Sequence, residues 1–526
     1  MSIEFILGLL TIGIYLVIRY LNSVDTPKIQ GLPQVPGVPV FGNLFQLGSY
    51  HHVTAQKLAK KYGPVFQVRM GNRRVVFVNT FESVKDIWIG QQTAMMSRPI
   101  LHTFHKIISS DGKAIFNSES FTVGTSPWDT SCKNRKKAIA TAMNRPKVQS
   151  YMPFIDLEVM ESLKEILRDS NDGDINVKPY IQRIALNMSL STNFGYRIGG
   201  TIGDHLLKEI TTVEAAMAFY RSTSSNWQDY VPLLRLFSKR TSEAGIWKVR
   251  RQKYMSDLHD LLKQKIVEGT DKPCISGGIL KDPDSKGLNE TEIKSIGFSI
   301  VAGGLDTLPG NLIMAIAYFS SEHGSEIQRR AYEEIMKVYP DGNAWEMCVE
   351  DGEKVAYITA LTKEILRFWS SVPVGLPRVN ISPVYWKGVK IPSGTTFLLN
   401  TYAANYDPEH FEHPEKFMPE RYLGDSAAAN AGIPHYTYGA GLRMCAGYQL
   451  ANREFYVFLV RLIVSFEVIP PKDPKDRPIL NAVECSAVPT SLTLVPKPFK
   501  VGFKPRDRSQ MERWISKSEA ITSHLL

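Results

Sequence analysis

One cysteine lies in a glycine-rich segment whose residue types suit a metal-containing cofactor. In residues 438–447, Cys445 follows Arg443 and is flanked by Gly441 and Gly447. Glycines let backbone pass close to a flat ligand, and a guanidinium suits bidentate recognition of carboxylates. Backbone N–H groups at the start of a following helix would stabilise a thiolate, and a thiolate on a haem iron favours O–O cleavage. A buried structural cysteine is the alternative, and the glycine–arginine–glycine frame disfavours it.

A second polar set interrupts a long apolar helix predicted over residues 291–320. Two adjacent glycines and Pro309 weaken its middle, because glycine costs about 1 kcal/mol against alanine and proline removes a backbone hydrogen bond. Two interpretations stay open: a break between two shorter helices, or a bulge that frees backbone groups beside a ligand. In the second, Asp306 and Thr307 supply an acid and a hydroxyl to an apolar wall, which suits proton delivery.

Three further charged residues are candidates for a structural cluster. Glu364 and Arg367 lie three positions apart on one face of a predicted helix, where a surface ion pair is the usual explanation. Arg421, in an extended segment with regularly placed prolines and aromatics, offers a third charge for a buried cluster. His410 and His413 have the spacing of a metal pair, but no third ligand is near, so we expect no metal there.

The composition is that of an ordinary globular protein with few cysteines. Hydrophobic residues make up 43% and charged residues 22% of the chain, which excludes a disordered chain, a collagen and a multispanning membrane protein. The five cysteines are scattered and form no CxxC pair, so a zinc finger, a cysteine-ligated iron–sulfur cluster and a disulfide framework are disfavoured. The net charge of +10 fits an anionic membrane or an acidic protein partner. Long basic runs are absent, so we expect no nucleic acid.

The elements that must position these residues form a helix-dominated mixed domain. Short strands are predicted over 65–70 and 73–79, mostly helices from 130 to 270, and a late helix around 447–465. Residues 276–289 read as a loop rich in glycine, aspartate, proline and lysine. No convincing linker divides the chain after residue 40.

The motifs together resemble those of the cytochrome P450 family of haem-thiolate monooxygenases. The likeness covers residues 30 to 500, and its four motifs fall in order on Gly304, Asp306 and Thr307, on Glu364 and Arg367, on Pro419, Glu420 and Arg421, and on Gly441, Arg443, Cys445 and Gly447. The resemblance implies a mainly α fold with small β-sheets, namely the cytochrome P450 fold. It also implies a single catalytic domain behind an N-terminal membrane anchor.

The resemblance also implies a cofactor and a role for each motif residue. The cofactor is haem b with Cys445 as the axial thiolate ligand of the iron, and electrons come from NADPH through a reductase. Thr307 and Asp306 are implied as the catalytic proton relay, and Glu364, Arg367 and Arg421 as structural residues. The implied haem contacts are Arg443, Arg378, Trp128, Gly441 and Gly447.

The chain departs from the family pattern at two positions near the expected haem. Tyr438 stands where a phenylalanine is usual, which changes the packing beside the thiolate. Cys132 stands where a basic residue normally follows Trp128 by four positions, with Lys133 and Arg135 nearby. The contact that this basic residue would make with a haem propionate is therefore not assigned.

A narrower likeness concerns the substrate. The string 304–311 is similar to that of fungal enzymes that hydroxylate small monocyclic aromatics. The resemblance implies insertion of one oxygen atom from O2 into a cresol or hydroxybenzyl alcohol of a polyketide secondary-metabolite pathway, or into phenylacetate or a hydroxyphenylacetate. The alternatives are a haem-thiolate isomerase or dehydratase, and a non-catalytic haem-binding protein. The Asp306–Thr307 pair argues against both.

The N-terminal stretch 3–21 is apolar and just long enough to span a bilayer. A cleaved signal peptide is the alternative, but it would need a basic start and a small-residue cleavage site. Because Arg19 and Lys28 follow the span, the positive-inside rule places the rest of the chain in the cytosol. We expect a single-pass protein of the endoplasmic reticulum membrane with a cytosolic catalytic domain.

The expected division is a transmembrane anchor at 1–22, a proline-rich hinge at 23–43, the catalytic domain at 44–505 and a C-terminal tail at 506–526. The expected partners are NADPH–cytochrome P450 reductase, with cytochrome b5 as a second donor, the membrane, O2 and a small aromatic substrate. A solvated basic surface without a partner is the alternative to reductase docking. The docking candidates are Lys133, Arg135, Lys136, Lys137 and Arg453.

Overall fold

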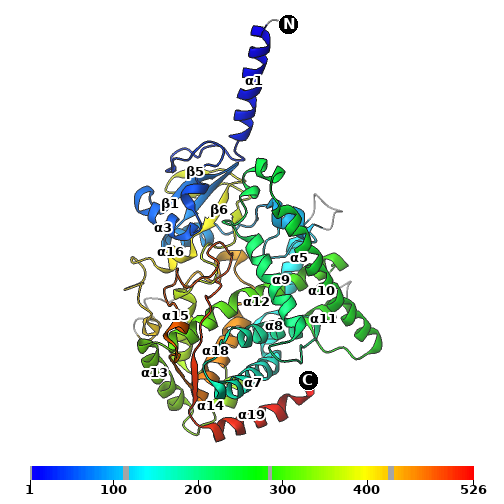
Figure 1. Ribbon diagram of the computed structural model, residues 1–526, viewed down its shortest axis with the longest axis vertical. Helices are drawn as coiled ribbons and strands as arrows, with labels where there is room; N and C mark the ends of the chain where they lie inside the picture. Colours follow the sequence, from blue (N-terminus) through cyan, green and yellow to red (C-terminus); the bar gives the residue numbers. More distant parts are fainter. Residues whose placement is uncertain (1–2, 111–117, 282–286, 425–431) are drawn as a thin grey trace.

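A computed structural model describes residues 3–110, 118–281, 287–424 and 432–526 (Figure 1). Helices gather around a long central helix, a small sheet lies at the end nearest the N-terminus, and one helix projects alone. The main helices are α1 (Ile3–Leu21), α2 (Leu44–Leu47), α3 (His51–Tyr62), α4 (Phe81–Val84), α5 (Thr130–Ala142), α6 (Arg145–Ser150), α7 (Met152–Asp169), α8 (Lys178–Phe194), α9 (His205–Arg221), α10 (Arg240–Glu268), α11 (Ile275–Lys281), α12 (Glu290–Phe319), α13 (Glu322–Val338), α14 (Ala344–Glu350), α15 (Ala356–Phe368), α16 (Thr401–Asn405), α18 (Tyr448–Ser465) and α19 (Arg508–Thr522).

The main sheet has the strand order β1-β2-β6-β3. β1 and β2 pair antiparallel, β2 and β6 parallel, and β6 and β3 antiparallel. The β-branched and aromatic residues of β1 and β2 are nearly all buried, which explains why these runs form strands. The strands are β1 (Val65–Met70), β2 (Arg73–Val78), β3 (Arg378–Val379), β4 (Val384–Trp386), β5 (Val389–Ile391), β6 (Thr396–Leu399), β7 (Phe466–Ile469) and β8 (Gly502–Pro505). The predicted mainly α fold with small sheets is confirmed.

The central helix α12 is continuous over 30 residues in spite of Pro309. Asn289 caps its N-terminus in a reciprocal capping box with Glu292. Apolar side chains of α12, including Ile296 and Ile316, are fully buried, so packing outweighs the local cost of the glycines and the proline. The interpretation as two shorter helices is therefore wrong. Although α12 is long and apolar enough to cross a membrane, it is mostly buried inside the protein.

One of the two mid-helix glycines is required by packing rather than by a bulge. α12 packs against α8, and a Cβ added to Gly304 would lie 2.4 Å from Ser189 Oγ of α8. A Cβ on Gly303 would meet no atom within 4 Å. Gly304 thus sets the distance between two core helices, and Gly303 leaves open space.

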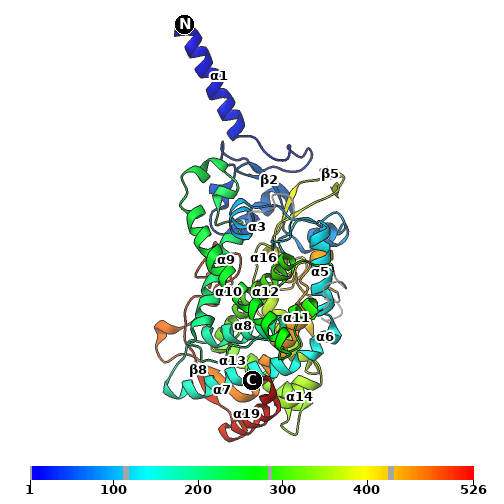
Figure 2. The same ribbon diagram turned by 90° about the vertical axis from the view of Figure 1, so that its right-hand side faces the viewer.

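The N-terminal helix α1 stands apart from the body in both views (Figures 1 and 2). Its described apolar side chains, such as Leu10 and Ile12, are more than half exposed. An exposed apolar helix of 19 residues fits a membrane anchor. At the other terminus, α19 packs on α7 and α14, and Trp514 of α19 stacks on Trp345 of α14 with ring centroids 5.6 Å apart.

One sequence prediction of a loop is partly wrong. Residues 275–281, at the start of the predicted loop 276–289, form helix α11. Its residues Ile275 and Ile279 are buried, so tertiary packing outweighs the poor helix propensity of Gly277 and Gly278. The middle of that loop, 282–286, lies outside the described residues, as does Asn117.

The Gly304–Ser189 contact gives a prediction for stability. Gly304→Ala forces a methyl group against Ser189 Oγ and is expected to cost about 1–3 kcal/mol, the usual range for overpacking. The measurement is the thermal unfolding midpoint of the haem-loaded protein. Ser189→Ala removes the clashing atom and leaves its Cβ at 3.7 Å, so the double variant should recover most of the loss. An equal loss in both backgrounds would contradict this account.

Candidate active site

The loop that carries Cys445 is held by glycines in unusual backbone conformations. Gly441 has φ +63°, and a Cβ there would lie 2.2 Å from the Trp88 carbonyl oxygen. The Cys445 N–H donates to the Tyr438 carbonyl at 2.9 Å and closes the loop. Helix α18 begins at Tyr448, directly after the loop. Cys445 therefore stands at a helix start, as the sequence predicted.

The Cys445 side chain is exposed to the cavity that it lines, although protein atoms surround the cavity. Burial raises the pKa of the Cys445 thiol, and the Gly447 N–H opposes that effect. Tyr438, in place of the usual phenylalanine, donates its hydroxyl to Asn452 Oδ1 at 2.7 Å. The extra hydroxyl is therefore satisfied away from the thiol.

The cavity has a volume of about 360 Å³ and lies between α12 and the Cys445 loop. Gly303, Gly304 and Thr307 line it from α12, and Cys445 and Gly447 line it from the loop and the start of α18. A thiol and a helix face on two walls of one cavity leave room for a flat group between them. Two further helices and a strand contribute to the walls through Lys136, Ile139, Ser189, Thr192 and Arg378.

Three arginines gather at this cavity without an acidic partner. Arg98, Arg378 and Arg443 line it, and among the described residues no carboxylate lies within ion-pairing distance of them. Burial, with Arg443 nearby, lowers the pKa of Arg378 to about 9. Burial and the two other guanidiniums also hold the pKa of Arg98 well below its usual range. Cys132 and Asp129 lie near Arg443, but no ion pair is described for the three guanidiniums. A ligand that carries carboxylates would pair with them.

Backbone carbonyls fix the orientation of these guanidiniums. Arg378 donates to the Ala440 carbonyl at 2.5 Å, and Arg443 to the carbonyls of Met96 and Val123 at 2.7 and 3.0 Å. The predicted haem contact Trp128 stacks on Arg443, whose guanidinium carbon lies 5.6 Å from the ring centroid.

A fourth cation comes from α5, where the sequence assigned no contact. Lys136 is half-buried and lines the cavity with Ile139 and Met143 of the same helix face. Burial and Arg443 lower the pKa of Lys136. Cys132 lies one turn earlier and is fully buried. The periodicity of α5 contained this signal, because positions 132, 136, 139 and 143 share one helix face.

Two of the five predicted docking residues are not on the surface. Arg135 is fully buried and donates to the carbonyls of Ser118 and Phe121 at 2.7 and 2.5 Å. Arg453 is buried against the Cys348 carbonyl, at 3.1 Å. Lys133 and Lys137 are exposed. Arg135 thus holds the segment before α5, and Arg453 joins α18 to the end of α14.

The Thr307 side chain lines the cavity and donates to the Gly303 carbonyl at 2.8 Å. This is the local contact that helix threonines often make. It uses the hydroxyl hydrogen and leaves the oxygen lone pairs free to accept a hydrogen bond. Asp306 lies beside Thr307 in α12, and its side chain lies outside the described part of the structure.

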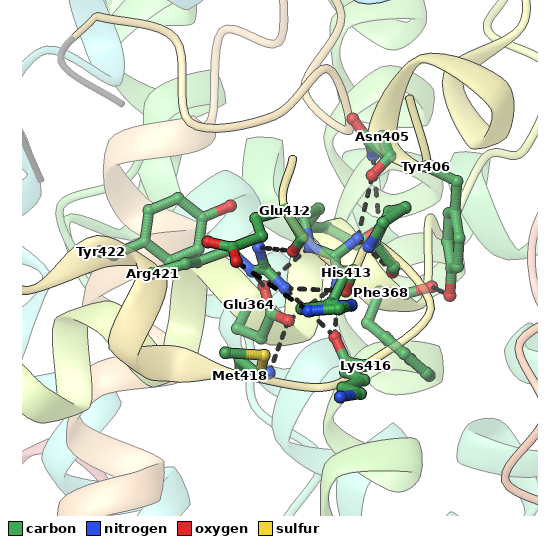
Figure 3. A network of polar contacts seen from close by, with 12 residues as sticks. Glu364, Phe368, Asn405, Tyr406, Glu412, His413, Lys416, Met418, Arg421 and Tyr422 are labelled. Carbon is green, nitrogen blue, oxygen red and sulfur yellow. Dashed lines mark hydrogen bonds and ion pairs between the residues drawn. The ribbon is translucent and has the colours of Figure 1, made fainter. Parts of the chain in front are cut away.

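The predicted charge cluster is fully buried (Figure 3). Glu364 accepts two hydrogen bonds from Arg367, both 2.8 Å long, and one from Arg421 at 3.1 Å. The Met418 N–H also donates to Glu364, at 2.8 Å. The structure therefore brings together the three charges that the sequence grouped, and the alternative of a surface pair is wrong.

This cluster reaches the cysteine loop through short polar contacts. Arg367 donates to the Asn405 carbonyl at 2.9 Å. The Asn405 side chain then accepts from the Tyr436 N–H at 2.8 Å and donates to Thr437 Oγ1 at 3.0 Å. Tyr438, the next residue, closes the loop at Cys445. The ion cluster and the loop are thus two ends of one network.

Sequence reasoning missed two polar residues of the cavity wall. Asn311, one turn after Thr307 on α12, is buried, and its Oδ1 has no hydrogen-bond partner. Glu454 of α18 is buried, and burial raises its pKa to about 8. Nothing in their spacing distinguished them from ordinary helix residues.

The comparisons with known proteins agree with this geometry. The family model described as cytochrome P450 matches residues 33–503. The chain belongs to the cytochrome P450 family. It is 58% identical to phenylacetate 2-hydroxylase of Emericella nidulans over 99% of this chain and 100% of that protein. It is 36% identical to 3-hydroxyphenylacetate 6-hydroxylase of the same organism, over 93% of this chain and 92% of that protein. It is 40% identical to a cytochrome P450 monooxygenase of Mycosarcoma maydis, over 90% of this chain and 87% of that protein.

Family membership confirms the enzyme class and the cofactor. The protein is a cytochrome P450 monooxygenase, and its cofactor is a haem iron with a cysteine thiolate ligand. The cavity fits this group, because Cys445 provides a thiol on one wall and unpaired cations can meet the haem carboxylates. The alternatives of an isomerase and of a non-catalytic haem protein are not favoured.

The buried cluster predicts a large loss of folded protein. Glu364→Ala leaves two arginines without their anion, and breaking a buried pair typically costs about 3–5 kcal/mol. We expect a strong drop in haem-loaded protein, with turnover per haem unchanged, measured by the carbon monoxide difference spectrum. The matched control is Glu326→Ala, which removes an exposed pair with Arg329 and should change little. Full haem loading with no turnover would contradict the structural role.

Proposed function

We propose that this cytochrome P450 hydroxylates phenylacetate at the ring position next to the side chain. The assignment of phenylacetate as the substrate is supported by the 58% identity to phenylacetate 2-hydroxylase over nearly the whole of both chains. The second relative of this substrate class, at 36% identity, also hydroxylates an arylacetate. Hydroxylation of a hydroxyphenylacetate is the second candidate, and the cresol-type substrate is set aside.

The residues of this chain have separate tasks in that reaction. Haem would supply the activation of dioxygen when bound, and we assign Cys445 as the residue whose thiolate would ligate its iron. Arg98, Arg378, Arg443 and Lys136 would hold the haem carboxylates. This assignment is supported by their common cavity and by the lack of any described acidic partner. Trp128 would act through Arg443, on which it stacks.

The proton relay is assigned to α12. Thr307 lines the cavity on the helix wall opposite Cys445, and its oxygen can accept a hydrogen bond from water while its hydrogen stays on the Gly303 carbonyl. Asp306 is the adjacent acid in the sequence. We propose that the pair would hold and deliver protons at the α12 wall of the cavity.

The membrane and redox partners complete the proposal. We propose that α1 anchors the protein in the endoplasmic reticulum membrane with the catalytic domain in the cytosol. Leu236 and Phe237 are 76% and 79% exposed, and these apolar side chains support a second contact with the membrane. NADPH–cytochrome P450 reductase is proposed as the electron donor, with cytochrome b5 as a second donor. Exposed Lys133 and Lys137 of α5 are the retained docking candidates.

The substrate assignment is tested with the reconstituted enzyme, a reductase and NADPH. We expect 2-hydroxyphenylacetate from phenylacetate, and a substrate-induced spectral shift that saturates. The comparison substrates are 3-hydroxyphenylacetate, m-cresol and m-hydroxybenzyl alcohol. Conversion of a cresol in preference to both arylacetates would refute the proposal, whereas preference for 3-hydroxyphenylacetate would select the second candidate.

Thr307 is tested by separating its shape from its hydroxyl. Thr307→Val keeps the size and loses the hydroxyl, and a positioned proton-transfer group is worth about 10²–10⁴-fold. We expect haem and substrate binding to stay normal, while NADPH oxidation yields hydrogen peroxide in place of product. Thr307→Ser retains the hydroxyl and should stay coupled. Tight coupling in the valine variant would restrict Thr307 to its contact with Gly303.

Lys136 is tested against its neighbour on the same helix. Lys136→Met removes one cation from the cavity and is expected to speed haem loss about fivefold, since a partly buried charge-assisted contact is worth roughly 1 kcal/mol. The measurement is haem transfer from the holoenzyme to an excess of apomyoglobin. Lys137→Met, at an exposed position, is the control. Equal rates in the two variants would remove Lys136 from the haem site.

A further inference from the structure

The C-terminal helix α19 lies beyond the residues that the family model matches, which end at 503. It is nevertheless folded against the body, and both views place it at the end of the molecule opposite α1, next to α7 and α14 (Figures 1 and 2). Its side chains Met511, Ile515 and Thr522 are at most 7% exposed. Residues 508–522 are therefore an ordered part of the fold, to which the family motifs assign no role.

Helix α19 holds the short helix α14 through a buried tryptophan. Trp345 of α14 is fully buried, and Trp514 of α19 stacks on it with an angle of 8° between the ring planes. The Trp345 indole N–H donates to Ser518 Oγ at 2.9 Å. The far end of α19 is fixed as well, because Lys272 Nζ donates to the Leu525 carbonyl at 2.6 Å. α14 thus packs on a helix that is itself anchored near its C-terminus.

Two buried arginines of α18 bind the backbone of α14. Arg461 donates to the Trp345 carbonyl at 3.0 Å, and its guanidinium carbon lies 4.5 Å from the Trp345 ring centroid. Arg453 donates to the carbonyls of Cys348 and Val349, both at 3.1 Å. A cation is favourable at the C-terminal end of a helix, where the last carbonyls lack partners within the helix. α14 is therefore attached to α18 at both of its ends.

The helix that these arginines hold begins directly after the cysteine loop. Arg453 lies eight positions after Cys445, and Gly447 and Ala451 between them line the cavity. Because α18 is one continuous helix, a shift at Arg453 would displace Cys445 relative to the cavity. The contacts thus form a continuous path from α19 through α14 and α18 to Cys445.

We propose that Trp514 is a positioning residue that holds α14 against α18 and thereby slows the loss of the Cys445 thiolate from the haem iron. Residues around a metal ligand orient it, and their mutation weakens metal binding. Without the Trp514 indole, Trp345 loses its stacked partner and meets water, so α14 can move away from α18 and Arg453 loses its acceptors. The inference rests on the assignment of Cys445 as the axial ligand, and not on the identity of the substrate.

The test follows the carbon monoxide spectrum of the reduced holoenzyme over time at a mildly raised temperature. The thiolate-type spectrum changes to a thiol-type spectrum when the thiolate is lost while haem stays bound. We expect Trp514→Ala to speed this change about tenfold, the upper end for the loss of a stacked aromatic pair. Trp514→Phe retains an aromatic ring and should stay within about twofold of the parent. Ser518→Ala removes only the hydrogen bond to Trp345 and should speed the change about threefold.

The route through α14 is tested by a double-mutant cycle. Arg453→Met removes the donor that binds the C-terminal end of α14. Trp514→Ala should then speed the spectral change by less than about threefold in the Arg453→Met background, because both substitutions release the same contact between helices. The full tenfold effect in both backgrounds would exclude α14 as the route and overturn the proposal.

The control is Lys517→Met, which removes a partly exposed pair with Glu346 between the same two helices and should leave the rate unchanged. A parental rate in Trp514→Ala would overturn the proposal even if the thermal unfolding midpoint falls, because a purely structural role of α19 would then suffice. If Trp514→Ala fails to bind haem, a parental rate in Ser518→Ala would overturn it. A parent protein without the thiolate-type spectrum would refute the assignment of Cys445, and this inference with it.

Discussion

Most of the active site depends on one buried charge interaction, in which Glu364 holds two arginines. Its carboxylate oxygens are saturated by Arg367, Arg421 and the Met418 N–H. Two cations around one anion leave a positive excess, and backbone carbonyls, including that of Asn405, accept the remaining guanidinium N–H groups. The cluster thus orders a segment that has almost no regular secondary structure. That order continues to Thr437 and the cysteine loop. The position of the cavity wall that carries Cys445 is therefore fixed by residues that do not contact the cofactor.

The distal wall depends on a different constraint, the close approach of α8 and α12. Gly304 allows it, and Pro309 interrupts the hydrogen-bond ladder of α12 without breaking the helix. The apolar faces of α12 before and after Pro309 are buried, and this packing keeps the two halves of the helix on one axis. Packing, and not local helix propensity, therefore keeps Gly303 and Thr307 in the helix wall of the cavity.

The sequence predicted the residues whose chemistry requires a rare local pattern. Cys445 was identifiable because Gly441, Arg443 and Gly447 around it form a pattern that is rare outside such sites. Glu364 was identifiable because its partner Arg367 lies one helical turn away. Arg135 and Arg453 show the limit: charge predicts exposure on average, yet both are buried where backbone carbonyls need donors. Lys136 could have been found from the periodicity of α5. Asn311 and Glu454 became visible only in three dimensions, because their role depends on the residues that face them across the cavity.

The uncompensated cations of the cavity have a consequence for the life of the protein in the cell. Without haem, Arg98, Arg378 and Arg443 repel one another in a partly buried space, and this repulsion favours the unfolded chain. A ligand that binds only the folded state shifts the folding equilibrium by mass action, and here it also removes that repulsion. The abundance of the enzyme should therefore follow the supply of haem during synthesis, with quality control degrading chains that stay unfolded until the cofactor arrives.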